Sequence, residues 1–336
     1  MSDAVKLGVI GAGAIAQVAH LVVLGRLEGV RMVGICDTDV ATAQALAGRF
    51  GISDVYDDIE DLFRYSQPDA VVICTPNHLH EVHVMSALSA GMHVLCERPL
   101  ALTLDGVERV MAAREQADRA VLVGMNHRYR SDVEAVRHFV AGGELGPLRL
   151  IRGTWHIFRP TGPAAGWRER RAESGGGAMF DLGLPLVDLA LWLSGCPAAK
   201  RVTAVLSARE EESEVEDSGC ALIRCQHDHS IFVDVSWRFV GKAEAFSFQV
   251  MGNRGSASIA PLAVFKEMHA APVNVTPTEP KSHEDVFSGS YRAEWEHFLD
   301  IVRGDAAHPE LKDQLLLHRT MEAIRRSAEE GRDIVP

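Results

Sequence analysis

Short apolar runs alternate with longer amphipathic segments along the first third of the chain. Five runs are rich in β-branched residues and predict buried strands: KLGVIGAG, VRMVGICD, AVVICTP, HVLCERP and AVLVGMN. The segments between them carry apolar residues three and four positions apart, a spacing that predicts helices. Because strands and helices alternate, the pattern indicates an α/β fold with a parallel sheet covered by helices on both faces.

Later in the chain the apolar runs are separated by turn residues rather than by helices. Six segments predict strands of this kind: LRLIRGTWHIF, KRVTAVLSA, GCALIRCQH, SIFVDVSWRF, AFSFQVMG and SASIAP. Two long amphipathic segments near the C-terminus predict helices: SYRAEWEHFLDIVRG and ELKDQLLLHRTMEAIRRSAEEG. The second part of the chain therefore differs in organisation from the first.

Length and charge limit the class of protein. The chain has 336 residues, enough for about two domains with their own cores. Its formal net charge of -12 at pH 7 offers no basic surface for a phosphate backbone, so we expect no nucleic-acid partner.

Cysteine usage and the N-terminus indicate the compartment. Six cysteines show no metal-binding spacing and suit free thiols: Cys36, Cys74, Cys96, Cys196, Cys220 and Cys225. No apolar run reaches the roughly 20 residues of a membrane helix. The segment MSDAVKLGVIGAG enters a strand without a signal-peptide pattern. We therefore expect a cytoplasmic protein with no membrane partner.

A glycine fingerprint, Gly11-Ala-Gly13-Ala-Ile-Ala16, joins the first strand to the first helix. Gly11 permits a tight turn, Gly13 lets the backbone approach a pyrophosphate, and small Ala16 permits close packing of the helix on the strand. Asp37 ends the second strand, where a carboxylate accepts hydrogen bonds from the adenosine ribose and repels a 2′-phosphate. The pattern predicts NAD as cofactor and disfavours NADP.

Polar clusters follow two further strands, CTPNHLHEVH at 74–83 and CERP at 96–99. Ligands of a doubly wound sheet bind outside the carboxyl ends of its strands, so both clusters should face the cofactor. The first cluster holds three histidines, His78, His80 and His83, but no acid or cysteine cluster accompanies them. We expect no metal site.

Four motifs in this order resemble the glucose-fructose oxidoreductase and inositol dehydrogenase family, Gfo/Idh/MocA: TPNHLH, AGMHVLCERPL, SGGGAMFDLGLPLVDLALWLSG and VEDSGCALIRC. The resemblance covers nearly the whole chain. It implies a Rossmann domain over residues 1–124. It also implies an α+β domain over residues 125–336, built on a large, mostly antiparallel open sheet. Because the open face commonly pairs subunits, a homodimer or homotetramer is expected.

The resemblance also implies hydride transfer between nicotinamide and a hydroxyl or carbonyl of a sugar, cyclitol or hydroxy acid. The implied cofactor contacts are Gly11, Gly13, Ala14, Ile15, Asp37, Thr75, Pro76, Asn77, His80, Glu97 and Arg98. The implied substrate contacts are Arg98, Asn126, Arg128, Trp167, Arg168 and Asp181, with Asp188 structural.

The first departure from the family lies in its Glu-Lys-Pro motif, which here reads Glu97-Arg98-Pro99. Arginine stays protonated at any ordinary pH, so it donates hydrogen bonds and positive charge but is a poor acid or base. Arg98 can therefore anchor a substrate without moving a proton.

The second departure removes the family's usual proton-transfer histidine, which follows an Asp by four residues. Here Asp181 is followed by Pro185, which has no titratable group. Because proline is tolerated in a first helical turn, the helix is expected to begin near Gly183 or Leu184.

Three interpretations stay open. In the first, the protein is a dehydrogenase or reductase whose proton passes through another group, a water relay or the substrate itself. The catalytic candidates are Arg98, Asp181 and His156, with His127 and Tyr129 as further proton carriers. Alternatively, it performs NAD-dependent elimination or isomerisation. In the third interpretation it binds NAD(H) without turnover, as a sensor or partner protein.

The arginines of the expected substrate region suggest a further hypothesis, an anionic substrate. These are Arg98, Arg128, Arg130, Arg152, Arg159 and Arg168. Guanidinium groups pair with carboxylate or phosphate through two hydrogen bonds. The alternative is that most of these arginines pair with Asp and Glu of this acidic chain or lie in solvent.

Overall fold

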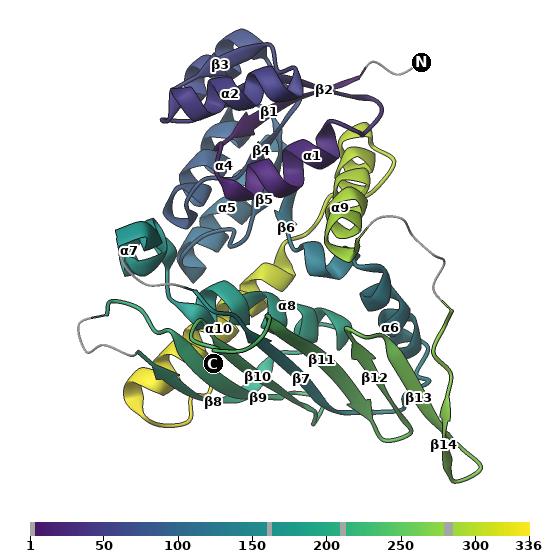
Figure 1. The fold of residues 1–336 in the computed structure, drawn as a ribbon. Coiled ribbons are helices and arrows are strands. Elements are labelled where there is room, and N and C mark those ends of the chain that lie inside the picture. Colours follow the sequence, from purple (N-terminus) through teal and green to yellow (C-terminus); the bar gives the residue numbers. More distant parts are fainter. Residues whose placement is uncertain (1–3, 160–162, 209–212, 279–284) are drawn as a thin grey trace. The chain divides into compact units, whose positions relative to one another are not determined.

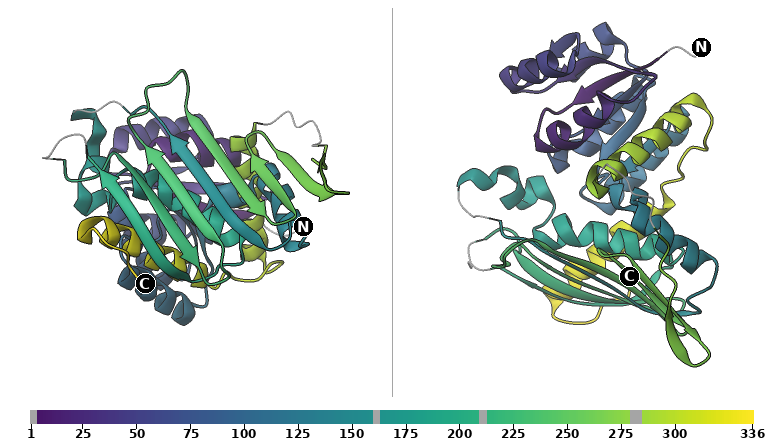
Figure 2. Two further views of the ribbon diagram at one scale, coloured as in Figure 1. Left: turned by 90° about the horizontal axis from the view of Figure 1, so that it is seen from below. Right: turned by 45° about the vertical axis from the view of Figure 1, so that its right-hand side comes forward.

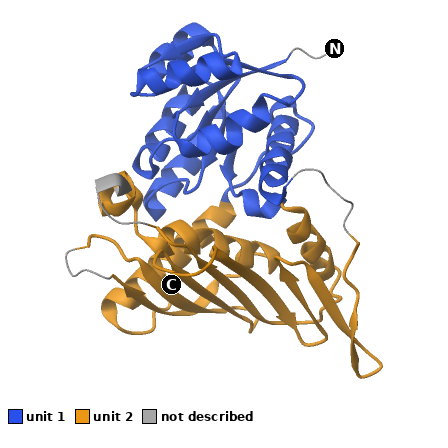
Figure 3. Ribbon diagram, in the orientation of Figure 1, with its two compact units in different colours: residues 1–129, 284–311 blue, residues 130–283, 312–336 orange. Residues whose placement is uncertain are grey.

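The computed structural model describes residues 4–159, 163–208, 213–278 and 285–336. The chain divides into two compact units. Residues 1–129 and 284–311 form the first, and residues 130–283 and 312–336 form the second (Figure 3). The first unit therefore takes up a segment from late in the sequence.

The first unit is built on a six-stranded parallel sheet in the order β3-β2-β1-β4-β5-β6. Its strands are β1 (Val5–Ile10), β2 (Val30–Cys36), β3 (Asp54–Tyr56), β4 (Ala70–Ile73), β5 (His93–Glu97) and β6 (Val121–Gly124) (Figure 1). This is the strand order of a dinucleotide-binding domain, and the predicted Rossmann fold is confirmed. The sequence pattern missed β3, which is short and partly exposed.

Helices cover both faces of this sheet. Successive side chains of β1 point to opposite faces, and those on each face pack against helices. Leu7 and Val9 face a core shared with η1 (Ala16–His20), α1 (Leu21–Leu24) and α2 (Val40–Phe50). Between them Gly8 faces Leu62 of η2 (Leu62–Ser66), to which a Cβ on Gly8 would come within 3.3 Å. The remaining helical segments before residue 130 are α3 (Ile59–Asp61), η3 (Asn77–Leu79), α4 (His80–Ser89), α5 (Leu104–Ala117) and η4 (Asn126–Tyr129).

Helix α9 (Val286–Arg303) belongs to the first unit although it follows the second sheet in sequence. Its Trp295 and Phe298 are fully buried in the same core as Leu7 and Val9. The expectation that this helix completes the second domain is wrong. Its amphipathic pattern shows that one face is apolar, but does not show which sheet that face covers. The boundary predicted between residues 124 and 125 stays a prediction.

The second unit is built on an eight-stranded sheet in the order β14-β13-β12-β11-β7-β10-β9-β8. Its strands are β7 (Leu148–His156), β8 (Ala199–Ser207), β9 (Ser218–Cys225), β10 (Ser230–Ser236), β11 (Ala245–Gly252), β12 (Gly255–Ile259), β13 (Ala263–Met268) and β14 (Ala271–Asn274). Only the β7–β10 pair is parallel among these strands, which confirms a mostly antiparallel sheet. Strands β13 and β14, at one end of the sheet, were not predicted.

The helices of the second unit are α6 (Ser131–Ala141), η5 (Pro163–Glu169), α7 (Arg171–Ser174), η6 (Met179–Gly183), α8 (Leu184–Leu193) and α10 (Lys312–Glu330). Helix α8 packs on β7 and β10, and α10 packs on β8 and α8. Both helices lie on one face of the sheet, as the edge-on view in Figure 2 shows.

Helix α8 begins at Leu184, near the predicted start, but helical backbone already begins at Ala178. Segment η6 is a wider π-type turn, and the Leu184 amide donates to the carbonyl of Met179, five residues earlier. Pro185 therefore lies after a turn of helix rather than at a free end. The wider turn shifts the backbone hydrogen bonds from i→i−4 to i→i−5 just before Pro185, the residue that has no backbone N–H to donate.

One helical segment of the described residues, Arg171–Leu193, is long and apolar enough to cross a membrane by length and composition. Of its most apolar window, 83% is buried inside the protein. Such burial is typical of a core helix that packs against a sheet, as α8 does.

Candidate functional site

The glycine turn, residues 11–13, follows β1 at the carboxyl edge of the parallel sheet. Gly11 has a φ of +97°, and a Cβ there would lie 2.7 Å from the carbonyl carbon of Cys74. Only glycine fits this position. A Cβ on Gly13 would meet only the Cys74 oxygen, at 3.8 Å, so the backbone is open beside the first turn of the helix. A pyrophosphate needs both features.

Asp37, directly after β2, accepts a hydrogen bond from the glycine turn. Its Oδ2 accepts the Ala12 amide at 2.6 Å, and its Oδ1 accepts the Asp39 amide at 2.8 Å. A carboxylate offers about four acceptor positions, so about two stay available for ribose hydroxyls. The residues present therefore fit an adenosine ribose next to the open backbone of Gly13.

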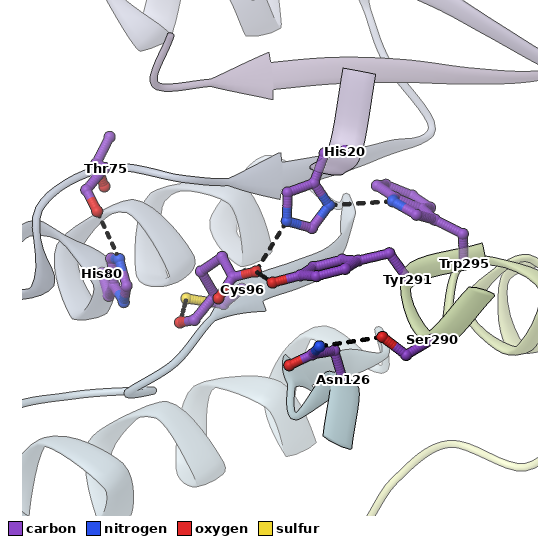
Figure 4. Close-up of polar contacts among 9 residues, drawn as sticks. His20, Thr75, His80, Cys96, Asn126, Ser290, Tyr291 and Trp295 are labelled. Carbon is purple, nitrogen blue, oxygen red and sulfur yellow. Dashed lines mark hydrogen bonds and ion pairs between the residues drawn. The ribbon is translucent and has the colours of Figure 1, made fainter. Parts of the chain in front are cut away.

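The loop after β4 carries Thr75, Pro76 and Asn77, all partly buried. His80 is 1% exposed, and its ring nitrogens lie 2.8 Å from the Thr75 carbonyl (Figure 4) and 2.6 Å from the Pro99 carbonyl. It therefore ties the loop after β4 to the loop after β5. The predicted cofactor contact by His80 stays a prediction, and its observed contacts are to backbone.

Glu97, the last residue of β5, lies in a buried network with side chains from two helices. Figure 4 labels three members of this network, His20, Tyr291 and Trp295. The Trp295 indole donates to Nδ1 of His20 at 3.0 Å, and Nε2 of His20 lies 2.9 Å from Oε1 of Glu97. Tyr291 donates its hydroxyl to the same oxygen at 3.3 Å. Because an indole N–H can only donate, Nδ1 of His20 accepts and Nε2 carries the hydrogen that Glu97 receives.

This network holds Glu97 as an anion. Burial by itself would raise the pKa of Glu97, but the hydrogen bond from His20 and the charge of Arg98 lower the pKa below its usual value. The sequence pattern did not predict a role for His20, Tyr291 or Trp295 at the site. The available signal was weak, a histidine within the apolar segment AIAQVAHLVVL and aromatic residues in a distant helix.

Asn126 and Arg128, two expected substrate contacts, lie on η4 after β6. Asn126 is buried and donates to the Ser290 hydroxyl of α9 at 3.1 Å (Figure 4). Arg98 directly follows β5 and is half-buried. The substrate roles of these three residues stay predictions. On the first unit they share the carboxyl edge of the sheet with the glycine turn.

Asp181 lies on η6 in the second unit, where two donors hold one of its oxygens. Its Oδ2 accepts from Nη2 of Arg159 at 3.0 Å and from the Trp237 indole at 3.1 Å. The Arg159 guanidinium lies over the Trp237 ring, 4.5 Å from its centroid. This geometry fixes the direction of the Asp181 carboxylate. Trp237, just after β10, carried no signal in the sequence.

The structure does not bring His156 to Asp181. A Cβ on Gly153 of β7 would lie 3.2 Å from Leu186, so Gly153 faces α8. His156, three residues on, points to the opposite face of the sheet because side chains alternate along a strand. There Nε2 of His156 lies 3.2 Å from Oδ2 of Asp234. Within this unit His156 therefore lies apart from Asp181, and its catalytic role stays a prediction.

Trp167 and Arg168 lie on η5, with the guanidinium 4.4 Å from the Trp167 ring centroid. Asp188 is buried in α8, at 2% exposure, as a structural residue would be. Two of the arginines invoked for an anionic substrate pair within their own unit. Arg130 binds both oxygens of Asp132 at 2.9 and 2.7 Å, and Arg159 binds Asp181.

The glycine run before Asp181 has a packing role. A Cβ on Gly177 would lie 1.7 Å from the carbonyl oxygen of Glu216. That oxygen accepts the Ala178 amide at 2.9 Å, and the Glu216 carboxylate accepts the Met179 amide at 3.0 Å. Glu216 thus caps the helix that carries Asp181, and Gly177 permits its approach.

Comparisons with known proteins agree with these features. A family model described as "Oxidoreductase family, NAD-binding Rossmann fold" matches residues 5–125, and a "GFO/IDH/MocA C-terminal domain" model matches residues 133–258. A 1,5-anhydro-D-fructose reductase of Ensifer adhaerens is 32% identical over 75% of this chain and 74% of its own. A D-glucoside 3-dehydrogenase of Escherichia coli (strain K12) is 31% identical over 60% of this chain and 58% of its own.

A solved structure supports the same assignment over the whole chain. The crystal structure of GenD2 from gentamicin A biosynthesis, in complex with NAD, has a TM-score of 0.87 and 26% identity. The match covers 100% of this chain and 97% of GenD2. The chain therefore belongs to the Gfo/Idh/MocA family of NAD-dependent oxidoreductases.

Proposed function

We propose that this protein interconverts a secondary hydroxyl and a carbonyl on a sugar or cyclitol and prefers NAD to NADP. The observation that carries the proposal is Asp37, whose carboxylate holds the Ala12 amide and keeps acceptor positions for ribose hydroxyls. A carboxylate at this point also repels a 2′-phosphate. The bound nicotinamide would supply the hydride acceptor or donor.

Arg98 and Asp181 are the residues that we assign to the substrate. Arg98 donates hydrogen bonds to the reacting oxygen and retains its own protons. Asp181 is aimed by Arg159 and Trp237 and accepts the hydroxyl hydrogen when the substrate is oxidised. Asp181 thereby takes the proton-transfer role for which the family pattern predicts a histidine at position 185.

A neutral polyol is the substrate class that we favour over an acid. Arg130 and Arg159 are neutralised by Asp132 and Asp181, which lowers the positive charge left for an anion. The names of the Ensifer and Escherichia relatives point to sugars and glucosides as well. A lower KM for a sugar acid than for its parent sugar would contradict this part of the proposal.

The test is a binding titration followed by a substrate screen. NADH and NADPH are titrated by fluorescence, and sugars, cyclitols and their keto and acid forms are then screened for a change in nicotinamide absorbance. We expect tighter binding of NADH and turnover of at least one neutral sugar or cyclitol. NADH binding without turnover of any compound in the panel would contradict the proposal that the protein is a dehydrogenase or reductase.

A protein that binds NAD(H) without turnover is the second candidate. Pro185 is buried at the position of the expected histidine, and the Asp181 carboxylate is already paired with Arg159. NAD-dependent elimination or isomerisation is the third candidate function. An enzyme of this kind would form product without a net change in nicotinamide absorbance.

A further inference from the structure

Glu294 on α9 is a buried acid that the proposed reaction does not use. Its side chain is 0% exposed, and neither carboxyl oxygen has a hydrogen-bond partner among the described residues. It lies next to Trp295 in sequence and one helical turn after Tyr291, which are both members of the Glu97 network. A carboxylate in this position would be a buried charge with no donor, which is costly.

The groups around Glu294 oppose its ionisation. Burial chiefly raises the pKa of Glu294 well above its usual value, the negative charge of Glu97 raises it further, and Arg128 only partly offsets both. The titratable and basic groups on the elements packed against α9 are His20 on η1, His127, Arg128 and Tyr129 on η4, and Glu97 and Arg98 at the end of β5.

Only one of the two acids has donors for its negative charge. Glu97 receives hydrogen bonds from His20 and Tyr291, whereas Glu294 receives none from the described residues. Because Nδ1 of His20 accepts the hydrogen of the Trp295 indole, the single N–H of His20 lies at Nε2 and points to Glu97. A negative charge on one buried acid disfavours ionisation of a second acid that interacts with it, so the acid without donors is the one that keeps its proton.

We propose that Glu294 is a positioning residue that keeps a proton at neutral pH, so that Glu97 alone is ionised and can accept a hydrogen bond from the nicotinamide ribose. The role at the ribose rests on the proposed function, whereas the place of the proton does not. No bond is made or broken, and Glu294 acts only through the charge of Glu97.

The place of the proton is tested on the protein without cofactor, by infrared difference spectroscopy of its carboxyl groups at pH 8. We expect the carbonyl band of a buried protonated acid in the wild type and in Glu97→Gln, and its loss in Glu294→Gln. The absence of the band from the wild type, or its loss in Glu97→Gln alone, would overturn the proposal.

A second measurement covers the case in which Glu97→Gln does not fold. The raised pKa means that the folded state holds a proton that the unfolded state releases above about 4.5. Wild-type stability should therefore fall relative to Glu294→Gln by about tenfold in the folding constant per pH unit above that value. A difference between the two proteins that does not change from pH 5 to pH 8 contradicts the proposal.

NADH titration of Glu294→Gln then tests the functional part. Glutamine is uncharged like the protonated acid and leaves the charge of Glu97 unchanged, so we expect an affinity within about threefold of the wild type, a difference below about 1 kcal/mol. A loss of more than tenfold with the fold intact would contradict a purely positioning role. If the wild type itself does not bind NADH, the proposed function fails, while the infrared result still decides where the proton lies.

Discussion

Asp37, at the carboxyl edge of the parallel sheet, has more than one role. Its carboxylate accepts hydrogen bonds from the Ala12 amide of the glycine turn and from the Asp39 amide of its own loop, and it is only partly buried. The same carboxylate is the group that would distinguish a ribose hydroxyl from a phosphate. Its replacement should therefore change both the affinity for the cofactor and the choice between cofactors.

We expect Asp37→Ser to weaken NADH binding by about 10- to 100-fold, because hydrogen bonds to a charged acceptor contribute about 1.5–3 kcal/mol. NADPH binding should weaken less or improve, since the repulsion of its phosphate is removed. Fluorescence titration of both cofactors measures the ratio. Asp39→Ser removes a neighbouring charge and keeps a capping oxygen, so it serves as control. An unchanged NADH to NADPH ratio in Asp37→Ser would exclude this role.

Asp181→Asn tests the proposed acid/base residue. Asparagine keeps the shape but cannot accept a proton at working pH, so kcat should fall by about 10²- to 10⁴-fold. NADH affinity should be retained because Asp181 lies on the other unit. The matched control is Asp217→Asn, which alters another acid that pairs with an arginine, Arg238, in the same unit. Full activity of Asp181→Asn would remove this residue from the mechanism.

At the scale of elements, the backbone at Gly177, before the helix that carries Asp181, must approach the backbone of Glu216 closely. The Glu216 carbonyl and carboxylate both receive amides from the start of the η6–α8 helix. This approach leaves no room for a side chain at Gly177. The glycine run is therefore a packing requirement of the helix that carries the candidate site.

Gly177→Ala should destabilise the protein by about 3 kcal/mol, because the added methyl would lie 1.7 Å from a backbone oxygen. Gly48→Ala is the matched control. Gly48 lies within α2 with nothing within 4 Å of its added Cβ, so alanine there should stabilise by about 0.4–1 kcal/mol. Urea unfolding midpoints compare the two variants. Equal midpoints would show that the helix start can move away from Glu216.

At the scale of the whole molecule, each unit holds partly or fully buried histidines that are neutral in the folded state. Burial lowers the pKa of His83 and His93 in the first unit, and of His318 in the second, to about 4. The unfolded chain protonates these residues at about 6.5, so below that pH the unfolded state binds more protons. Their contribution to stability is therefore present above pH 6.5 and is lost as the pH falls toward 4.

His318→Gln should reduce this acid sensitivity, because glutamine does not take up a proton on unfolding. Urea midpoints measured from pH 8 to pH 5 should fall less steeply in the variant than in the wild type. His227→Gln alters an exposed histidine of the same unit and should leave the slope unchanged. If the urea midpoints of His318→Gln and of the wild type fell equally steeply with pH, the inference that His318 is neutral in the folded state would be contradicted.

Several features were determined by the sequence alone, because they depend on neighbours in the chain. The five apolar runs specify buried parallel strands, and Gly11, Gly13 and Asp37 specify a turn and an acid at the ends of two of them. The replacements at Arg98 and Pro185 are likewise visible without coordinates. Each of these inferences uses spacing of a few residues or a position at the end of a strand.

The tertiary structure alone decided which distant groups meet. The apolar face of α9 could have covered either sheet. Its packing on the first unit brings Tyr291 directly to Glu97 and links Trp295 to Glu97 through His20. The alternation along β7 turns His156 away from Asp181, whose partners come from other segments. Periodicity shows that a face is buried, but the contacts that cover it are set by the packing of the whole chain.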